Sequence, residues 1–228
     1  MEYGYYSTQT YLFEIVGFQL LGEMAANLRR FDFVHELAAQ AQDEAEHARL
    51  YREVVSSLPS TVLHGPLDAH ASPIYEAFVA RGTIEEKVVA SYFVLEGVAM
   101  GIFAARQHFY RSSPLAEIDH RILSEEAQHQ AMGVQLVAEL VRGGRLSLDD
   151  VGEIIREASV AVGRLLVPTA LFERFGVGDA AQERERILSS GFLAMQRSTS
   201  QKSMLNALRR LRRSLAGTPG EASHARAA

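Results

Sequence analysis

The chain carries one pattern of glutamates and histidines twice. In each copy a glutamate stands at the same distance before an E-x-x-H motif, and the two copies match position by position without an insertion. The first copy is Glu14, Glu44 and His47, and the second is Glu96, Glu126 and His129. If these residues act together, both halves of the chain must meet at one place, which favours a single folded unit over two independent ones.

The spacing within each copy fits helices that direct acidic and imidazole side chains at one site. Residues i and i+3 are neighbours on a helix face, so an E-x-x-H motif offers a carboxylate and an imidazole to the same metal ion. The interval from Glu14 to Glu44 fits an antiparallel hairpin, in which the second helix returns about as far as the first one ran. Two such hairpins supply the ligands found in bundles that bind two iron or two manganese ions. The pattern therefore predicts a two-metal site inside a helical bundle.

Two other E-x-x-H motifs occur in the chain: Glu117 with His120, and Glu221 with His224. Neither has a glutamate at the matching earlier position, where Lys87 and Gly191 stand instead. Glu117 also lies nine residues before Glu126, which corresponds to about 180° around a helix. The second motif stands in a tail rich in Gly, Pro and Ala. We expect both motifs to lie outside the metal site.

Glu96 is the only charged residue in the stretch Val88–Ala105. Glu14 stands in a similar apolar setting, whereas Glu23, nine residues further on, faces the other side of the same helix. A buried carboxylate is costly unless it is paired or binds a metal, so the alternative is a protonated or arginine-paired glutamate. The apolar stretch approaches the minimum length of a membrane span, but its central glutamate and its amphipathic neighbours favour the interior of a bundle.

Apolar residues recur at intervals of three and four along nearly the whole chain, which predicts an all-α protein. The predicted helices span residues 8–30, 32–57, 83–111, 114–142, 147–174 and 179–214. Residues 58–82, rich in Pro and Gly, form a long connection with a short helix at 73–80. The turn before the fourth helix falls near Pro114, and Ser147 with Asp150 resembles a capping box that opens the fifth. Pro168 is expected to kink that helix.

Composition bounds the class of protein. The chain has 228 residues, of which 47% are hydrophobic, and the repeat favours one domain over residues 1–215, followed by a disordered tail at 216–228. No cysteine is present, which excludes disulfides, iron–sulfur clusters and cysteine-ligated zinc. The N-terminus lacks the basic and apolar regions of a signal peptide, so a cytoplasmic protein is expected.

The charge does not favour a nucleic-acid partner. The net charge is −5 at pH 7. One basic cluster stands near the C-terminus and consists of Arg209, Arg210, Arg212 and Arg213. Such a cluster is typical of a solvated helix end, where the helix dipole favours positive charge.

The paired pattern, a glutamate followed by D/E-E-x-x-H, resembles the ferritin-like di-iron carboxylate superfamily over residues 8–142. The resemblance implies a four-helix bundle with a long crossover between helices two and three, plus two additional C-terminal helices. Rubrerythrins of this superfamily typically add a cysteine-rich domain, which is absent from a chain without cysteine. In length and in its extra helices the chain is most similar to aldehyde-deformylating oxygenase, although this similarity does not fix an aldehyde as the substrate.

The resemblance also implies roles for the six residues. Glu44 and Glu126 would bridge or chelate two irons, and each histidine would bind one of them. Glu14 and Glu96 would be terminal ligands. Four carboxylates and two imidazoles suit iron, or a manganese–iron pair, better than copper or structural zinc.

Residues next to the ligands suggest supporting roles. Asp43 and Glu125 resemble the acids that hydrogen-bond the free nitrogen of a ligand histidine, with helix-surface charge as the alternative. Tyr11 and Tyr92 each share a helix face with a terminal ligand and could bond to it or be oxidised, although a plain core tyrosine is the commoner case. Three small residues near the ligands fit either a substrate channel or close helix packing: Gly17, Gly97 and Gly101.

We expect an O₂-activating non-haem di-iron oxygenase or oxidase that acts on a small, largely apolar organic substrate. Electrons would come from an external ferredoxin or reductase, since no flavin, nicotinamide or cysteine-based redox site is recognisable. The alternatives are a ferroxidase or peroxide-reducing rubrerythrin-like protein, a tRNA-modifying hydroxylase, and a non-catalytic helical interaction module. A ligand-sized apolar cavity touching the metals would favour the oxygenase, and a packed core the ferroxidase. No membrane partner is expected, and apolar helix faces would allow a homodimer.

Overall fold

The computed structural model describes residues 2–28, 31–57, 78, 82–165, 182, 185, 189 and 191–217. Every regular element within these residues is helical, which confirms the predicted all-α class. In chain order the elements are α1 (Glu2–Asn27), α2 (Phe31–Ser56), α4 (Ile84–Val89), the π-helical η2 (Ala90–Leu95), α5 (Glu96–Phe109), α6 (Pro114–Arg142), α7 (Leu148–Leu165) and α10 (Gly191–Ala216).

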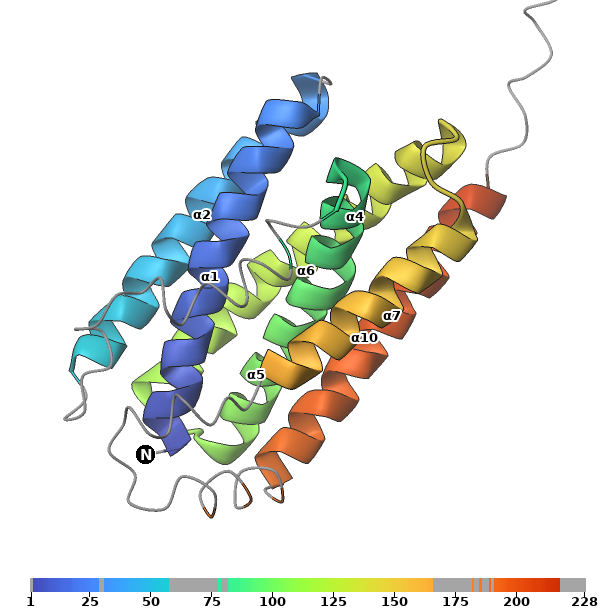
Figure 1. Ribbon diagram of the computed structural model, residues 1–228. Coiled ribbons are helices and arrows are strands. Elements are labelled where there is room, and N and C mark those ends of the chain that lie inside the picture. Colours follow the sequence, from blue (N-terminus) through green and yellow to red (C-terminus); the bar gives the residue numbers. More distant parts are fainter. Residues whose placement is uncertain are drawn as a thin grey trace, which may run out of the picture.

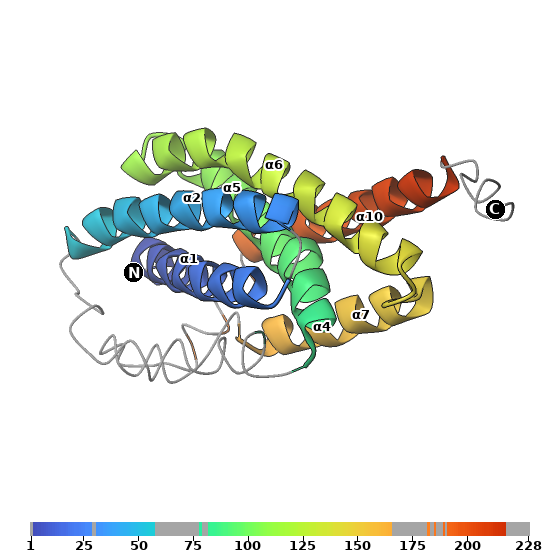
Figure 2. The same ribbon diagram turned by 90° about the horizontal axis from the view of Figure 1, so that it is seen from above.

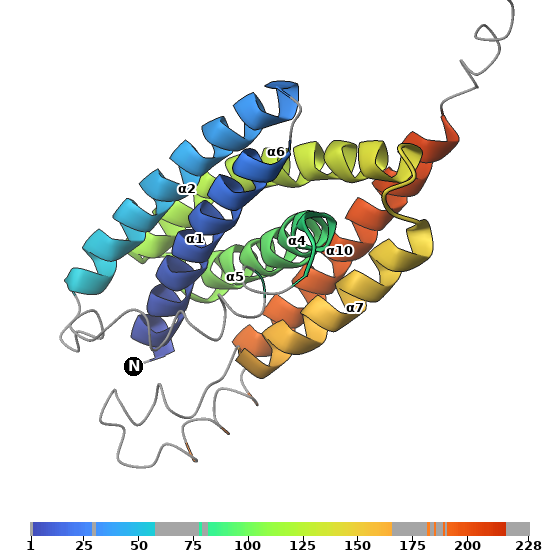
Figure 3. The same cartoon turned by 45° about the horizontal axis from the view of Figure 1, so that its top comes forward.

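The helices are arranged around one central helix (Figure 1). α4, η2 and α5 follow one another without a break, and this composite helix contacts α1, α6, α7 and α10. α1 and α2 form an antiparallel pair on one side of it, and α7 and α10 lie on the other side (Figure 2, Figure 3). α6 packs against both α2 and α10. The central helix therefore packs directly on α1 and α6, and α2 packs on both of these helices.

The central helix is apolar because it forms the core. Residues Ile84–Phe109 are long and apolar enough to cross a membrane, but 83% of their most apolar 18-residue window is buried inside the protein. Phe93, Val94 and Phe103 are fully buried. A helix that is hydrophobic all round is typical of the interior of a folded protein, which agrees with the interior position predicted for Val88–Ala105.

The helix predicted at 83–111 contains an irregularity that its sequence does not indicate. Residues Ala90–Leu95 form a π-helix, after which the N–H of Glu96 bonds to the carbonyl oxygen of Ser91. Such segments are rare inside α-helices and occur mostly at functional sites. Here the π-helix ends directly before Glu96, one of the predicted metal ligands.

The starts of α6 and α7 agree with the predicted turn and the predicted capping box, respectively. Ser113 Oγ accepts from the N–H of Ala116 at 3.2 Å, which starts α6 at the predicted turn. The N–H of Ser147 donates to Asp150 Oδ2 at 2.7 Å, and the N–H of Asp150 donates to Ser147 Oγ at 3.1 Å. The capping box predicted for the fifth helix is therefore confirmed.

The helix limits differ from the predicted ones at the chain ends. α1 begins at Glu2 rather than at residue 8, and α10 extends to Ala216, into the predicted tail. The tail beyond Gly217, residues 58–77 of the connection and the predicted kink at Pro168 lie outside the described residues. So does most of the segment between α7 and α10.

Two glycines of α5 allow α10 to approach closely. A Cβ on Gly101 would lie 2.0 Å from Ser200 Oγ and 2.5 Å from the carbonyl oxygen of Gln196. A Cβ on Gly97 would lie 2.9 Å from Met204 Cγ. Any side chain at these positions would push α10 away. Gly97 and Gly101 therefore serve close helix packing, and not a substrate channel.

Candidate metal centre

The structure brings the six residues of the repeated pattern into one buried cluster. They are Glu14 from α1, Glu44 and His47 from α2, Glu96 from α5, and Glu126 and His129 from α6. Each of these residues is at most 6% exposed. One copy of the pattern comes from the pair α1–α2 and the other from the pair α5–α6, as the spacing within each copy predicts.

The ligand atoms form two overlapping groups. The first group is Glu14, Glu44, His47 and Glu126, and the second is Glu44, Glu96, Glu126 and His129. Within each group the ligand atoms all lie within 4.8 Å of one another. Buried carboxylates and imidazoles at this spacing could hold a metal ion in each group. Glu44 and Glu126 belong to both groups and so lie between the two positions.

Each histidine is bonded by an acid from the other copy of the pattern. His47 Nε2 lies 2.8 Å from Glu125 Oε2, and His129 Nε2 lies 3.2 Å from Asp43 Oδ2. The hydrogen bonds predicted for these acids are therefore present, and they cross between α2 and α6. When Nε2 donates its hydrogen to a carboxylate, Nδ1 is left as the atom that can bind a metal.

The Nδ1 atoms face the carboxylate oxygens. His47 Nδ1 lies 3.4 Å from both Glu14 Oε2 and Glu126 Oε1. It is buried, and no hydrogen bond to it is formed among the described residues. His129 Nδ1 lies 3.3 Å from Glu126 Oε2 and 3.5 Å from Glu44 Oε1. A buried polar atom without a partner is costly, and a cation between these atoms would supply one, so the residues fit a metal ion.

Burial and crowding make the cluster hold protons in the absence of a cation. Burial, together with the charges of Glu126 and Glu14, raises the pKa of Glu44. Burial and Glu126 likewise raise the pKa of Glu96. Burial alone would lower the pKa of His47, but the nearby carboxylates of Glu126 and Glu14 raise it to about 12. A divalent cation must displace such protons, because metal ligands bind in their deprotonated form.

Gln40 also contacts the cluster, although the repeated pattern does not include it. Its Nε2 donates to Glu96 Oε1 at 2.9 Å and to Glu44 Oε1 at 3.2 Å. Its Oε1 accepts from Tyr92 Oη at 2.9 Å. Gln40 lies one turn before Glu44 and therefore on the same helix face, which is the signal that could have revealed it. Tyr92 reaches the ligands through Gln40 rather than directly.

A buried ion pair adjoins the cluster. Arg106 is fully buried, and its guanidinium donates to both oxygens of Asp119 at 2.7 Å. It also donates to Thr10 Oγ1 at 2.8 Å, and Tyr51 Oη donates to Asp119 Oδ1 at 2.7 Å. Tyr51 lies one turn after His47 on the same face of α2. Arg106 is the residue directly after Val88–Ala105, so a count of charges within that stretch misses it.

The residues that the sequence argument set aside lie elsewhere. Glu117 and His120 are exposed on α6. Glu23 forms an ion pair with Lys87, away from the cluster. The motif at 221–224 lies outside the described residues, and the basic cluster near the C-terminus is exposed on α10.

The cavity that touches the cluster is small. Its volume is about 30 Å³, and it is lined by the four carboxylates and by residues that include Phe13, Gly17, Leu95 and Ala99. A space of this size holds about one or two water-sized molecules. Phe13, Gly17 and Ala99 are only half-buried, so the cavity lies close to the surface between α1 and α5. Gly17 lines this space, and a Cβ there would make an ordinary van der Waals contact with Glu44 Oε2 at 3.4 Å.

Comparison with known proteins gives no relative for this chain. No family model, no curated protein and no solved structure matches it. The similarity to ferritin-like di-iron proteins therefore rests on the repeated motif, and the metal-binding capacity rests on the geometry of the cluster.

Proposed function

We propose that this protein is a non-haem di-iron oxidoreductase that activates O₂. The observation that carries the proposal is the pair of four-ligand groups that share Glu44 and Glu126. Cations in the two groups would be neighbours joined by shared carboxylates. Four carboxylates balance the charge of two divalent ions, and oxygen and imidazole ligands suit iron or a manganese–iron pair.

The proposal includes a ferritin-like four-helix bundle. Its helices would be α1, α2, the continuous η2–α5 and α6, with residues 58–82 as the crossover and α7 and α10 as additions. In such bundles two helices give one glutamate each and two give E-x-x-H motifs. The distribution of the six residues over the helices supports this assignment.

Two adjacent iron ions, when bound, supply the open coordination positions and the electrons that O₂ chemistry requires. Neighbouring side chains of the protein orient the ligands for these ions. Glu125 and Asp43 fix the imidazoles so that Nδ1 faces the ligand groups, and Gln40 orients two of the carboxylates. Burial keeps bulk water away from them. Since no redox cofactor site is recognisable in the sequence, an external ferredoxin or reductase would supply electrons.

A small, largely apolar organic molecule is the substrate of this first proposal, although the cavity of about 30 Å³ beside the carboxylates is not the ligand-sized cavity expected of an oxygenase. Phe13, Leu95 and Ala99 give the cavity beside the carboxylates an apolar wall. Phe13 and Ala99 are partly exposed, so an apolar molecule could approach the cluster between α1 and α5. Substrate pockets typically combine apolar walls with a few polar groups that converge on the reacting centre.

A ferroxidase or peroxide-reducing protein is the second candidate. The cavity next to the carboxylates has a volume of about 30 Å³, whereas sites for drug-sized molecules span about 300–1,000 Å³. It accepts an oxidant such as O₂ or peroxide without any movement of the chain. This candidate predicts oxidation of Fe(II) with no organic product.

Anaerobic loading with Fe(II), followed by exposure to O₂ and a chemical reductant, tests the proposal. We expect about two irons per chain, as the six-ligand set implies, and an absorbance change after O₂ is added. Candidate aldehydes, acids, amines and aromatics are then supplied in turn, and an oxidised product identifies an oxygenase or oxidase. Rapid Fe(II) oxidation by peroxide without such a product identifies the second candidate. If the protein holds neither iron nor manganese, and Glu44→Ala behaves as the parent protein does, the metal-dependent proposal is wrong.

A further inference from the structure

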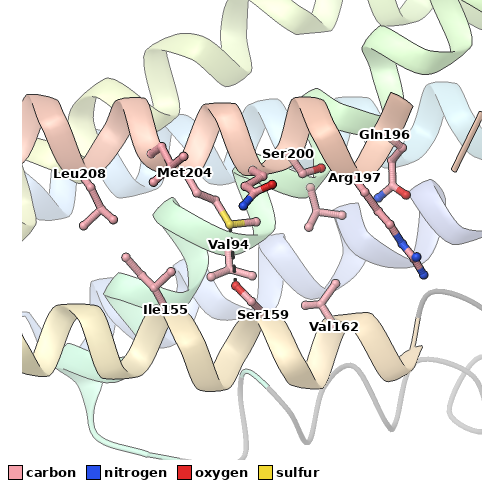
Figure 4. A pocket seen from close by; sticks show the side chains of 12 residues that line it. Val94, Ile155, Ser159, Val162, Gln196, Arg197, Ser200, Met204 and Leu208 are labelled. Carbon is pink, nitrogen blue, oxygen red and sulfur yellow. Dashed lines mark hydrogen bonds between the residues drawn. The ribbon is translucent and has the colours of Figure 1, made fainter. Parts of the chain in front are cut away.

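A larger cavity lies on the reverse face of the helix that carries Glu96. Its volume is about 450 Å³, and α7, α10 and the central helix line it (Figure 4). Val94 and Val98 line it and stand two residues before and after Glu96. Two residues correspond to about 200° of rotation around a helix, so these valines face away from the carboxylates. The cavity is therefore separate from the metal-ligand cluster.

The cavity exists because α7 and α10 do not close on each other. The two helices lie side by side (Figure 3), yet each packs mainly on the central helix. The walls between them are largely apolar, with Ile155 and Val162 from α7 and Met204 and Leu208 from α10. The volume falls in the range of sites that hold small organic molecules.

Two buried polar atoms in the wall of this cavity have no partner. Among the described residues, Gln196 Oε1 and Ser200 Oγ are buried and make no hydrogen bond. The two residues are 1% and 5% exposed, respectively, and both line the cavity. Ser200 Oγ is packed against Gly101, whereas the Gln196 side chain leaves α10 on the side that faces α7 (Figure 4). A buried carbonyl oxygen without a donor is costly, so a ligand that donates to Gln196 Oε1 would stabilise the protein.

We propose that this cavity binds a neutral amphiphile, with an aliphatic body between α7 and α10 and a single hydroxyl or amide head. The head donates a hydrogen bond to Gln196 Oε1. Arg197, the charged side chain of the wall, is exposed to solvent, so water already hydrates its charge and recognition of the head falls to Gln196. The site does not depend on the proposed redox function, because one helix separates it from the metal ligands.

Calorimetric titration of the metal-free, full-length protein with three molecules of similar size tests the head group. The probes are 1-octanol, which donates a hydrogen bond, 2-octanone, which only accepts, and octanoate, which is anionic. We expect 1-octanol to bind about two- to tenfold more tightly than 2-octanone, the effect of one hydrogen bond. Gln196→Met should remove that difference while both molecules still bind. Tighter binding of octanoate that is lost in Arg197→Gln would overturn the neutral head, and equal binding of alcohol and ketone would overturn the role of Gln196.

A matched pair of substitutions on α7 tests the place of binding. Ser159 lines the cavity, and its neighbour Val160 is 49% exposed and lies outside the lining. Ser159→Phe fills the space and should abolish binding of 1-octanol, whereas Val160→Phe should leave the dissociation constant unchanged. Binding that survives Ser159→Phe, or that is lost equally in both variants, would place the ligand elsewhere. Because neither metal nor O₂ is present, failure of the di-iron proposal does not affect either outcome.

Discussion

The two copies of the repeated pattern agree in the residues that could touch a metal ion. Each copy gives one glutamate on its first helix and an E-x-x-H motif on its second. Each histidine is bonded at Nε2 by an acid that precedes the motif of the other copy. Binding of two neighbouring metal ions would explain this agreement, since a shared pair of metal positions needs the same donor atoms from both sides.

The copies differ in what lies around the ligands. When the copies are aligned on their ligands, Gln40 of the first matches Ile122 of the second, and Thr10 of the first matches Tyr92 of the second. Gln40 bonds to both Tyr92 and Glu96, whereas Ile122 is apolar and cannot bond to a carboxylate. Thr10 bonds instead to the buried guanidinium of the arginine that follows the apolar stretch. The repeated ligands thus sit in unequal surroundings, and we expect two metal positions of unequal affinity.

The largest expected effect comes from removing a shared carboxylate. Glu44→Ala takes a ligand from both groups and should abolish binding of both ions, whereas Glu96→Ala takes a ligand from one group only and should leave one ion bound. Metal content per chain after anaerobic loading, measured by plasma emission, distinguishes these cases. Glu117→Ala, at the exposed motif on the same helix as Glu126, is the control and should keep both ions. If Glu44→Ala and Glu96→Ala retain the same metal content, the shared-ligand arrangement is wrong.

Removal of Arg106 tests the neighbour that only one copy possesses. Arg106→Met leaves Asp119 as a buried carboxylate without its ion-pair partner, and we expect the free energy of unfolding in urea to fall by about 3–5 kcal/mol. Adding Asp119→Leu should restore much of this loss, because no buried charge then remains unpaired. The exposed pair of Arg156 and Glu153 on α7 is the control, and Arg156→Met should cost less than about 1 kcal/mol. A loss this small for Arg106→Met would contradict the structural role.

The crossing hydrogen bonds should differ in strength between the copies. Glu125 lies 2.8 Å from His47 with its side chain 35% exposed, whereas Asp43 lies 3.2 Å from His129 with its side chain 47% exposed. Loss of an acid behind a ligand histidine typically costs about 10- to 100-fold in metal affinity. We therefore expect a larger loss for Glu125→Ala than for Asp43→Ala in a Co(II) titration followed by absorbance. The reverse order would show that the shorter bond is not the stronger support.

Replacing Gln40 by the residue of the other copy should make the copies more alike. Gln40→Ile removes the bonds to Glu96 and Glu44, and we expect the ion held by Glu96 to lose about tenfold in affinity. Tyr92→Phe should have a smaller effect, since it removes only the donor to Gln40. A Co(II) titration that resolves two steps measures both variants, with circular dichroism as a check of folding. Equal weakening of both steps would mean that Gln40 does not distinguish the two positions.

The six candidate ligands could be predicted because metal chemistry restricts residue type and spacing. A ligand pair on one helix needs the i, i+3 interval, and two helices of a hairpin need a fixed distance along the chain. These rules identified Glu14 and Glu96 in apolar surroundings, and the structure places both in the cluster. The bonds from Asp43 and Glu125 to histidines were expected from the resemblance to di-iron proteins and not from these rules, and neither source indicated that the bonds cross to the other copy.

Features that depend on neighbours in space were not predictable. Whether Gly97 and Gly101 make room for a channel or for a helix depends on where α10 lies, and only the structure decides it. The π-helix before Glu96 changes the register of a helix whose apolar residues face in every direction, so no periodic signal marks it. The pairing of Arg106 with Asp119 joins two helices, and each residue alone reads as ordinary surface charge.

The stability of the metal-free protein should depend on pH. The pKa of His47 is raised to about 12 in the folded state, against about 6.5 when unfolded. The stabilisation is complete below pH 6.5 and is lost as the pH rises toward 12. Between these two pH values the folded state holds a proton that the unfolded state has already released, so each rise in pH favours the unfolded state. The pKa values of Glu44 and Glu96 are also raised, so these carboxyls likewise lower the stability of the folded state as the pH rises above the usual pKa of a glutamate. Urea unfolding at pH 6.5 and pH 9 should therefore show lower stability at pH 9, and His47→Gln should flatten this slope. His120→Gln, exposed on α6, should leave the slope unchanged, and the same slope in all three proteins would mean that other groups cause it.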